Sequence, residues 1–318
     1  MSLFARANRR FLLRYRLEYL LALFLIYGIR ALSPAFAWGC ARLAGAALWR
    51  FGVRRRVVLE NLALAFPDRD EVERRAIARR TFQHFACMAV DIVFQRRFVT
   101  RRNLYERFHV VGWAREFLAE HGEQELRRRA QRVLFMTAHI GNWELASGFF
   151  SLFGIRIAPV YRAAQNPFLE RLLRQLRLER HYALIERRGA VNEMLERFDR
   201  GENVGFLFDQ EAVYGIYVPF LGHPACTHKT PAVLARDFGV KIFFGVMIRR
   251  GDFLSYEGRG RLLDAFERTG DREADLERIT AYLNRLLEDE IRSAPDQYLW
   301  MHRRWKRTGA YEAKEREA

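Results

Sequence analysis

Apolar and polar positions follow one pattern before about residue 108 and another after it. After it, short apolar runs bounded by polar residues predict six strands, at 108–112, 132–139, 155–162, 203–210, 240–250 and 253–260. Between and after these runs, apolar residues at helical spacing predict helices over 113–129, 143–152, 167–177, 190–199, 230–237 and 271–295. Alternation of this kind indicates an α/β fold in which helices flank a central, largely parallel sheet.

Residues 1–55 are strongly apolar after a basic start. Four residues interrupt the apolar part: Glu18, Arg30, Pro34 and Arg42. Two arrangements in a membrane fit this pattern: helices starting near Arg16 and Pro34 that lie in the membrane face, or one tilted span over 17–32. A buried helical hairpin is the third possibility. Basic flanks and interfacial tyrosines and tryptophans favour membrane contact, and the length and the charges argue against a signal peptide.

The pattern divides the chain into two parts. We expect a membrane-associated helical segment over 1–55, and one α/β domain over 56–318 with a helical lead-in at 56–107. In the lead-in, Asp68 is expected to cap a long amphipathic helix, because acidic residues fill the turn that follows it.

Charge and cysteine content narrow the function classes. Lysine and arginine total 54 against 38 acidic residues, a net charge of +16, which indicates an anionic partner. The basic residues are spread over several helices and no nucleic-acid motif is present, so no nucleic-acid partner is expected. Three isolated cysteines indicate neither a disulfide framework nor a zinc ribbon. His223 and His228 lack an evident third ligand, so no metal site is expected.

The strand over 132–139 ends in a pair of ionisable residues. His139 lies at its carboxyl end, where α/β sheets bind ligands, and Asn142 is expected to cap a helix that carries Glu144 in its first turn. A carboxylate bonded to one ring nitrogen fixes the histidine tautomer and leaves the other nitrogen as a base. Such a pair suits deprotonation of a hydroxyl that attacks an activated acyl group.

The five-residue spacing alone is weak, because His181 and Glu186 share it. That second pair lies at the amino end of a strand, away from the expected cleft. The position of His139 at a strand's carboxyl end therefore favours it over His181.

Other predicted strands also end in polar residues: Arg162, Asp209 and Gln210. Each is either a substrate contact or an ordinary loop residue. An arginine there could hold an anionic group or a developing oxyanion. The turn-rich segment 218–225 is expected to form a wall of the acyl channel.

Seven segments in order resemble one protein family: "NLALAFPD" (61–68), "TAHIGNWELA" (137–146), "VYRAAQNP" (160–167), "FLFDQ" (206–210), "VPFLGHPA" (218–225), "LARDFGVKIFFGVMIRR" (234–250) and "YLWMHRRWK" (298–306). The chain looks like a member of the bacterial lipid A biosynthesis lauroyl/myristoyl acyltransferases, within the glycerolipid acyltransferase superfamily. The resemblance covers most of the chain.

The resemblance implies transfer of an acyl chain from an acyl-carrier-protein thioester to a hydroxyl of a lipid A precursor. His139 would be the general base and Glu144 its partner, with Asn142, Arg162, Asp209 and Gln210 as substrate-binding residues. No cofactor is implied, only acyl carrier protein or coenzyme A as the carrier of the acyl co-substrate. Acyl carrier protein, a lipid or glycolipid acceptor and the membrane surface would be partners, at the cytoplasmic face of the bacterial inner membrane.

Two segments depart from the family pattern. His228 and Lys229, and the stretch "DQEAVYGIYVPF" (209–220), are unexpected and leave the acceptor open. A phosphatidylinositol mannoside or a glycerophospholipid is an alternative acceptor, although Ala138 and the lack of a Phe-Pro-Glu-Gly block make the glycerol-phosphate branch a poorer fit. A non-catalytic basic membrane-binding protein is the alternative from another class.

Overall fold

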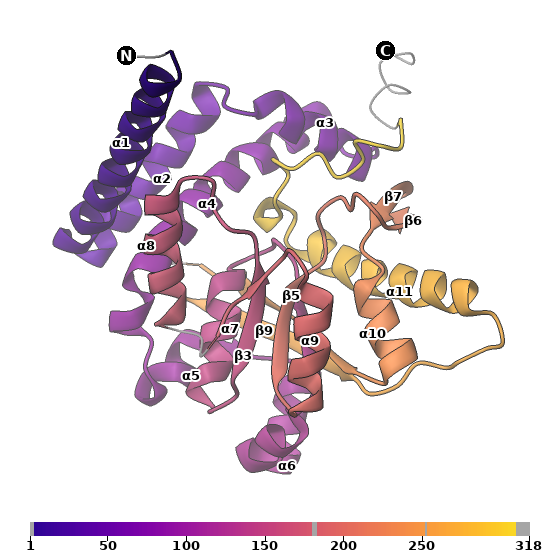
Figure 1. Cartoon of the computed structure of the whole chain (residues 1–318). Helices are drawn as coiled ribbons and strands as arrows, with labels where there is room; N and C mark the ends of the chain where they lie inside the picture. Colours follow the sequence, from indigo (N-terminus) through magenta and orange to yellow (C-terminus); the bar gives the residue numbers. More distant parts are fainter. Residues whose placement is uncertain (1–2, 180–182, 252, 310–318) are drawn as a thin grey trace.

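The computed structural model describes residues 3–179, 183–251 and 253–309 (Figure 1). The amino-terminal half holds α1 (Leu3–Ala31), α2 (Pro34–Arg50), α3 (Arg55–Ala65), α4 (Glu71–Phe98), η1 (Arg101–Asn103), α5 (Leu104–Arg107), β1 (Phe108–Val110), α6 (Trp113–Arg129), β2 (Val133–Thr137), α7 (Trp143–Leu152) and β3 (Ile157–Tyr161). The remainder holds α8 (Pro167–Leu178), β4 (Ile185–Glu186), α9 (Ala190–Asp199), β5 (Asn203–Leu207), β6 (Ile216–Phe220), β7 (His223–Thr227), α10 (Thr230–Phe238), β8 (Lys241–Arg249), β9 (Tyr256–Leu263), α11 (Arg272–Ser293) and η2 (Pro295–Gln297).

Seven strands form the central sheet, in the order β1-β9-β8-β2-β5-β3-β4. All neighbouring pairs are parallel except β8–β9, which is an antiparallel hairpin. The α/β class and the largely parallel sheet are therefore confirmed. β2 lies between β8 and β5, so the carboxyl end of β2 is in the middle of the sheet, where two flanking loops can reach it.

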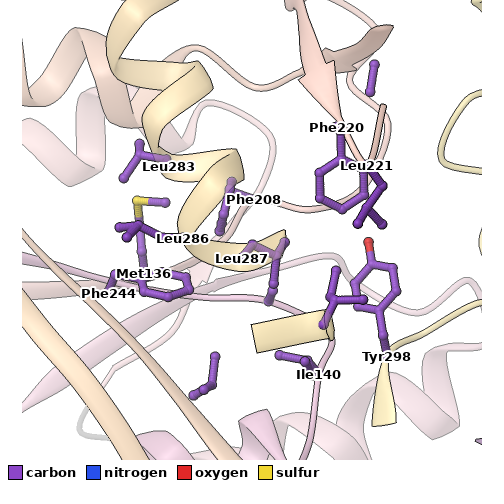
Figure 2. Packing of buried hydrophobic residues seen from close by; sticks show 14 of the residues in the cluster. Met136, Ile140, Phe208, Phe220, Leu221, Phe244, Leu283, Leu286, Leu287 and Tyr298 are labelled. Carbon is purple, nitrogen blue, oxygen red and sulfur yellow. The ribbon is translucent and has the colours of Figure 1, made fainter. Parts of the chain in front are cut away.

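The two faces of the sheet bury separate clusters. Alternate residues of β2 and β8, such as Met136 and Phe244, pack against the apolar side of α11 (Figure 2). Their immediate neighbours Phe135 and Phe243 point to the opposite face, where they pack with residues of α7. The strands are thus buried on both sides, which explains why they appear in the sequence as continuous apolar runs without alternation.

The amino-terminal segment forms two helices, α1 and α2: the second begins at Pro34 as expected, but the first begins at Leu3 and not near Arg16. Ser33 caps α2, with Pro34 in its first turn, and this breaks the apolar segment into two. α2 lies along α4, and α1 contacts α8 and α4 (Figure 1). Among the described residues no helix is both long enough and apolar enough to cross a bilayer, so the single tilted span over 17–32 is not supported.

The outer sides of α1 and α2 remain apolar and open. Large apolar side chains on α1 and α2, such as Phe24 (73% exposed) and Leu43 (73%), are mostly left uncovered by the part of the chain that the structure describes. The hairpin is therefore not a buried one. Contiguous exposed apolar surface of this kind marks an interaction site in a soluble or membrane-bound protein.

The lead-in helix α4 is capped two residues later than expected. Asp70, not Asp68, accepts a hydrogen bond from the Glu73 amide, and the Glu73 side chain returns a bond to the Asp70 amide. Both aspartates have a glutamate three positions on, Glu71 and Glu73, but only Asp70 and Glu73 form the reciprocal bonds of a capping box. This helix runs from the capping box to Phe98 and brings His84 to the turn after β2 and Asp91 to the end of β8.

Candidate active site

The chain leaves β2 through a tight turn of fixed geometry. Gly141 has a φ of +59°, and a Cβ atom there would lie 1.8 Å from the carbonyl oxygen of Met247. The Gly141 amide donates to Gln297 O, and the Asn142 amide donates to Met247 O. Only glycine satisfies both the left-handed backbone and this approach to β8. The turn places His139 on one side and the start of α7 on the other.

His139 is paired with Asp209. Its Nδ1 lies 2.8 Å from Asp209 Oδ1, and its backbone amide donates to Asp209 Oδ2 at 3.0 Å. Asp209 follows β5, the parallel neighbour of β2, and is 2% exposed. A buried carboxylate that accepts from both the ring and the main chain of one histidine leaves that side chain one orientation. Nδ1 is thereby the protonated nitrogen, and Nε2 is left for a substrate.

Glu144 does not hold the position expected of it at Nδ1, because Asp209 is there. Its carboxylate lies 3.6 Å from Arg177 of α8 and lines the same cavity as His139. Trp143, between the two in sequence, packs edge-on against the His139 ring with 4.9 Å between ring centroids. His139 therefore has a hydrogen-bonded carboxylate at Nδ1 and a second carboxylate nearby.

The two carboxylates set the charge on the ring. Burial lowers the pKa of His139, but the charge of Asp209, its hydrogen bond and the charge of Glu144 outweigh burial, so the pKa is raised overall. Burial by itself raises the pKa of Asp209, and its contacts with His139 bring that pKa below its ordinary value. The site therefore stabilises the pair of imidazolium and carboxylate, which is the state a histidine base reaches after taking a proton.

A cavity of about 620 Å³ opens at His139. Polar and charged side chains line one part: His139, Glu144, Arg162, Arg177, Arg187, Gln210 and His228. Aromatic side chains between the sheet and α6 and α7 line another: Trp113, Phe117, Phe135, Phe149, Phe150 and Phe243. An apolar cavity with a few convergent polar groups is typical of a site for a ligand with one greasy and one polar part.

The structure separates the predicted binding residues into two groups. Arg162 and Gln210 line the cavity, as expected of residues that contact a substrate. Asn142 caps α7 as predicted, but it is fully buried and is not among the residues that line the cavity. Asp209 faces His139, so its contact is with the histidine ring.

Two other expectations concern segments away from the cavity. Residues 218–225 lie in the antiparallel β6–β7 hairpin, which packs on α11, and none of them lines the cavity. They are thus not the expected channel wall. His181 lies outside the described residues. Among those that the structure describes, no three histidine, cysteine, aspartate or glutamate side chains are grouped as metal ligands.

Two residues near the carboxyl terminus, His302 and Arg304, support the site although no role for them was predicted from the sequence. Nε2 of His302 accepts the Glu211 amide at 3.0 Å, which holds the loop just after Asp209. Arg304, 1% exposed, donates to Cys226 O and to Thr227 Oγ1, and its charge acts on Asp209. The only signal in the sequence was the segment 298–306, whose resemblance to a family signature gives no partner for either residue.

Comparison with known proteins identifies the family. A family model described as bacterial lipid A biosynthesis acyltransferase matches residues 5–307. Two Escherichia coli (strain K12) proteins are similar. The lipid A biosynthesis lauroyltransferase is 27% identical over 263 residues, 81% of each chain, and the palmitoleoyltransferase is 28% identical over 265 residues, 80% of this chain and 79% of the other. A lipid A biosynthesis acyltransferase of Haemophilus influenzae is 25% identical over 285 residues, 87% and 84% of the two chains.

The match over nearly the whole chain makes this protein an acyltransferase. It belongs to the family of bacterial lipid A biosynthesis acyltransferases.

The charge balance around His139 can be measured directly. We expect an NMR titration of its ring to give a pKa above the ordinary value, and Asp209→Asn to lower it, because the largest charge that favours the imidazolium is removed. Glu144→Gln should lower it by less. A larger effect of Glu144→Gln than of Asp209→Asn would contradict the assignment of Asp209 as the principal partner.

Proposed function

We propose that this protein transfers a fatty acyl chain from an acyl-carrier-protein thioester to a hydroxyl of a lipid A precursor. The observation that carries the proposal is the His139–Asp209 pair, which lies at the junction between polar and aromatic parts of one cavity. Acyl transfer needs a base for the hydroxyl and an apolar space for the chain, and both are present at one place.

In the proposed reaction, Nε2 of His139 takes the proton of the acceptor hydroxyl as its oxygen attacks the thioester carbonyl. The C–S bond of the tetrahedral intermediate then breaks, and the leaving thiolate takes the proton back from Nε2. The products are an ester and a free carrier thiol, and no cofactor is needed. Asp209 holds Nδ1–H and stabilises the imidazolium formed midway, and the charge of Glu144 adds to that effect.

The acyl chain would lie between the sheet and helices α6 and α7. Gly205 and Gly245 both line the cavity, and because they have no side chain they leave space above the sheet. The ring of Phe243 rests on Gly245 and Gly260, since a Cβ on either would lie under 3 Å from it. Phe243 also borders a second, small void shared with α6, so its ring stands between the two spaces. It is placed to limit the length of chain that fits.

The charged part of the cavity suits an anionic substrate. Arg162, Arg177 and Arg187 all line it, and Arg177 is near Glu144. Guanidinium groups bind phosphate through paired hydrogen bonds. The phosphates of a lipid A precursor and the phosphate of a carrier's prosthetic arm are the anions that these arginines would hold. The net charge of +16 also favours an acidic carrier protein.

We further propose that α1 and α2 dock on the cytoplasmic face of the bacterial inner membrane. Their exposed apolar side chains, with Phe24 and Leu43 among the most exposed, would enter the acyl boundary while arginines of the same helices meet anionic headgroups. The acceptor and product are membrane lipids, so a docked enzyme meets them without extracting them fully.

Replacing the base tests the reaction. With an acyl carrier thioester and a lipid A precursor, release of free carrier thiol by His139→Ala should fall at least 1000-fold, near the upper range for loss of a general base. Asp209→Asn should fall by a similar order because the ring tautomer is lost. His109→Ala, on an exposed strand position, is the control and should keep full activity. Undiminished turnover by His139→Ala would refute the mechanism.

Chain-length preference tests the location of the acyl chain. Phe243→Ala joins the cavity to the small void beside it, so the preferred donor should become longer by two or more carbons. Phe244→Ala is the matched control, because Phe244 is equally buried but lies on the opposite face of the sheet. A competition assay with carrier-bound C10 to C18 chains gives the preference. An equal shift in both variants would place the acyl chain elsewhere.

Vesicle flotation tests docking of α1 and α2. Phe24→Ser with Leu43→Ser should weaken binding to phosphatidylethanolamine/phosphatidylglycerol vesicles about tenfold or more, since each side chain contributes roughly 1.5–3 kcal/mol when buried. Val72→Ser is the control, because Val72 is equally exposed but lies at the start of α4. Equal loss in the control, or no loss in the double variant, would count against this docking surface.

A further inference from the structure

A chain of buried polar groups lies beneath the turn that carries His139. Nδ2 of Asn142 donates to Tyr256 Oη at 3.1 Å, and Tyr256 Oη donates to Asp91 Oδ2 at 2.5 Å. The three residues are inaccessible to solvent. At its other end, Oδ1 of Asn142 accepts the Leu145 amide and caps α7. This series of hydrogen bonds thus runs from the Asp91 carboxylate on α4 to the first turn of α7, the helix that bears Glu144.

Arg249 at the end of β8 supplies the balancing charge. Its Nη1 lies 2.7 Å from Asp91 Oδ2, and its guanidinium lies over the ring of Tyr256, 4.9 Å from the centroid. Trp38 of α2 faces the same guanidinium at 5.8 Å. Burial raises the pKa of Asp91, and the charge of Arg249 and the hydrogen bond from Tyr256 oppose that rise. The ion pair with Arg249 favours the carboxylate form, in which Asp91 accepts the Tyr256 hydroxyl.

The charge of Asp91 fixes the direction of each bond in the chain. Tyr256 has a single hydroxyl proton, and Asp91 takes it, so the oxygen of Tyr256 is left to accept. Only the nitrogen of the Asn142 amide can donate to that oxygen. The amide oxygen must then face Leu145, which is the orientation that caps a helix. Without the ion pair, the amide could turn over and present its nitrogen to the Leu145 amide.

We propose that Asp91, Arg249 and Tyr256 are positioning residues for acyl transfer, which act through Asn142 by holding its cap oxygen toward α7 and so placing Glu144 beside His139. This inference rests on the proposed function. Arg249 and Tyr256 are paired across the β8–β9 hairpin, Asp91 comes from the distant helix α4, and none of the three lines the cavity. They contact neither substrate nor base.

A second bond from α4 acts on the same turn. Nε2 of His84 lies 3.0 Å from the Gly141 carbonyl oxygen. Burial lowers the pKa of His84 to about 3, with a further contribution from the Arg249 charge, so the ring is neutral at physiological pH and Nε2 is its donor. His84 and Asp91 are seven residues apart and therefore lie on one face of α4. That face of α4 therefore contacts the turn in two ways: His84 bonds to the main chain of Gly141, and Asp91 acts through Tyr256 on the side chain of Asn142.

Tyr256→Phe is the first variant to test, because it removes one oxygen and leaves the ion pair in place. We expect kcat to fall about ten- to a hundredfold, as for a small misplacement of catalytic groups, with KM for the acyl carrier thioester changed less than twofold. Amide exchange at Leu145 should accelerate in the same variant. Phe108→Leu is the control, because Phe108 stacks on the Tyr256 ring without a polar contact, and it should keep both kcat and Leu145 protection while losing stability.

Serine at position 142 distinguishes positioning from general stability. A serine hydroxyl caps α7 without an amide that can turn over, so Asn142→Ser combined with Tyr256→Phe should recover most of the kcat lost in Tyr256→Phe alone. Asn142→Ala with Tyr256→Phe should not recover it. A purely structural role for Tyr256 predicts that the serine double variant is the slower enzyme, and that result would overturn the proposal.

If Tyr256→Phe does not fold, Asp91→Asn with Arg249→Met removes both charges together and leaves no unpaired ion. Its kcat should fall and its Leu145 exchange should rise. Wild-type kcat and unchanged exchange in this pair, or in Tyr256→Phe, would refute the inference. A wild-type enzyme that releases no carrier thiol would instead refute the proposed function, and Leu145 exchange, which needs no substrate, would still test the network.

Discussion

The turn from His139 to Asn142 is the constraint on which the rest of the site depends. Its main chain bonds to β8, to α4 and to the segment after η2, and its glycine has no room for a side chain. A rigid turn lets β2 and α7 present their ends at a fixed angle. His139 from the strand and Glu144 from the helix then face one cavity without long flexible side chains to hold them.

The two faces of the sheet serve different purposes. The face toward α11 is packed with large apolar side chains, as Figure 2 shows around Leu286 and Phe244, and supplies stability. The other face keeps glycine at Gly205 and Gly245 and leaves an open space beside an aromatic cluster. One sheet therefore combines a dense core with a cavity because neighbouring residues of the same strands point to opposite sides.

The sequence predicted the parallel sheet, the strand end at His139 and the cap at Asn142, because each depends on residues close together in the chain. It did not predict the pairing of His139 with Asp209, which depends on β5 lying next to β2. Seventy residues separate the two, and no spacing rule covers that distance. Glu144 was the nearer carboxylate in sequence, but the first turn of a helix directs its side chain toward the cavity and α8.

The buried network was hidden for a similar reason. Asp91 and Arg249 each lie in a predicted element, but nothing in their local sequence marks them as a pair. The cap of α4 was missed by two residues because both Asp68 and Asp70 fit the general pattern, and only the reciprocal bond with Glu73 separates them. Periodicity identified elements, while tertiary contacts decided which polar residues meet.

The contacts of the turn with the carboxyl-terminal segment bear on how the protein folds. Gln297 O accepts the Gly141 amide, and the Leu299 amide donates to His139 O, across about 160 residues of chain. Contacts between residues this far apart in sequence form late, because a long loop must close first. During synthesis the turn lacks these partners until almost the whole described chain has left the ribosome. We therefore expect the turn that carries His139, the proposed base, to become ordered only late in folding.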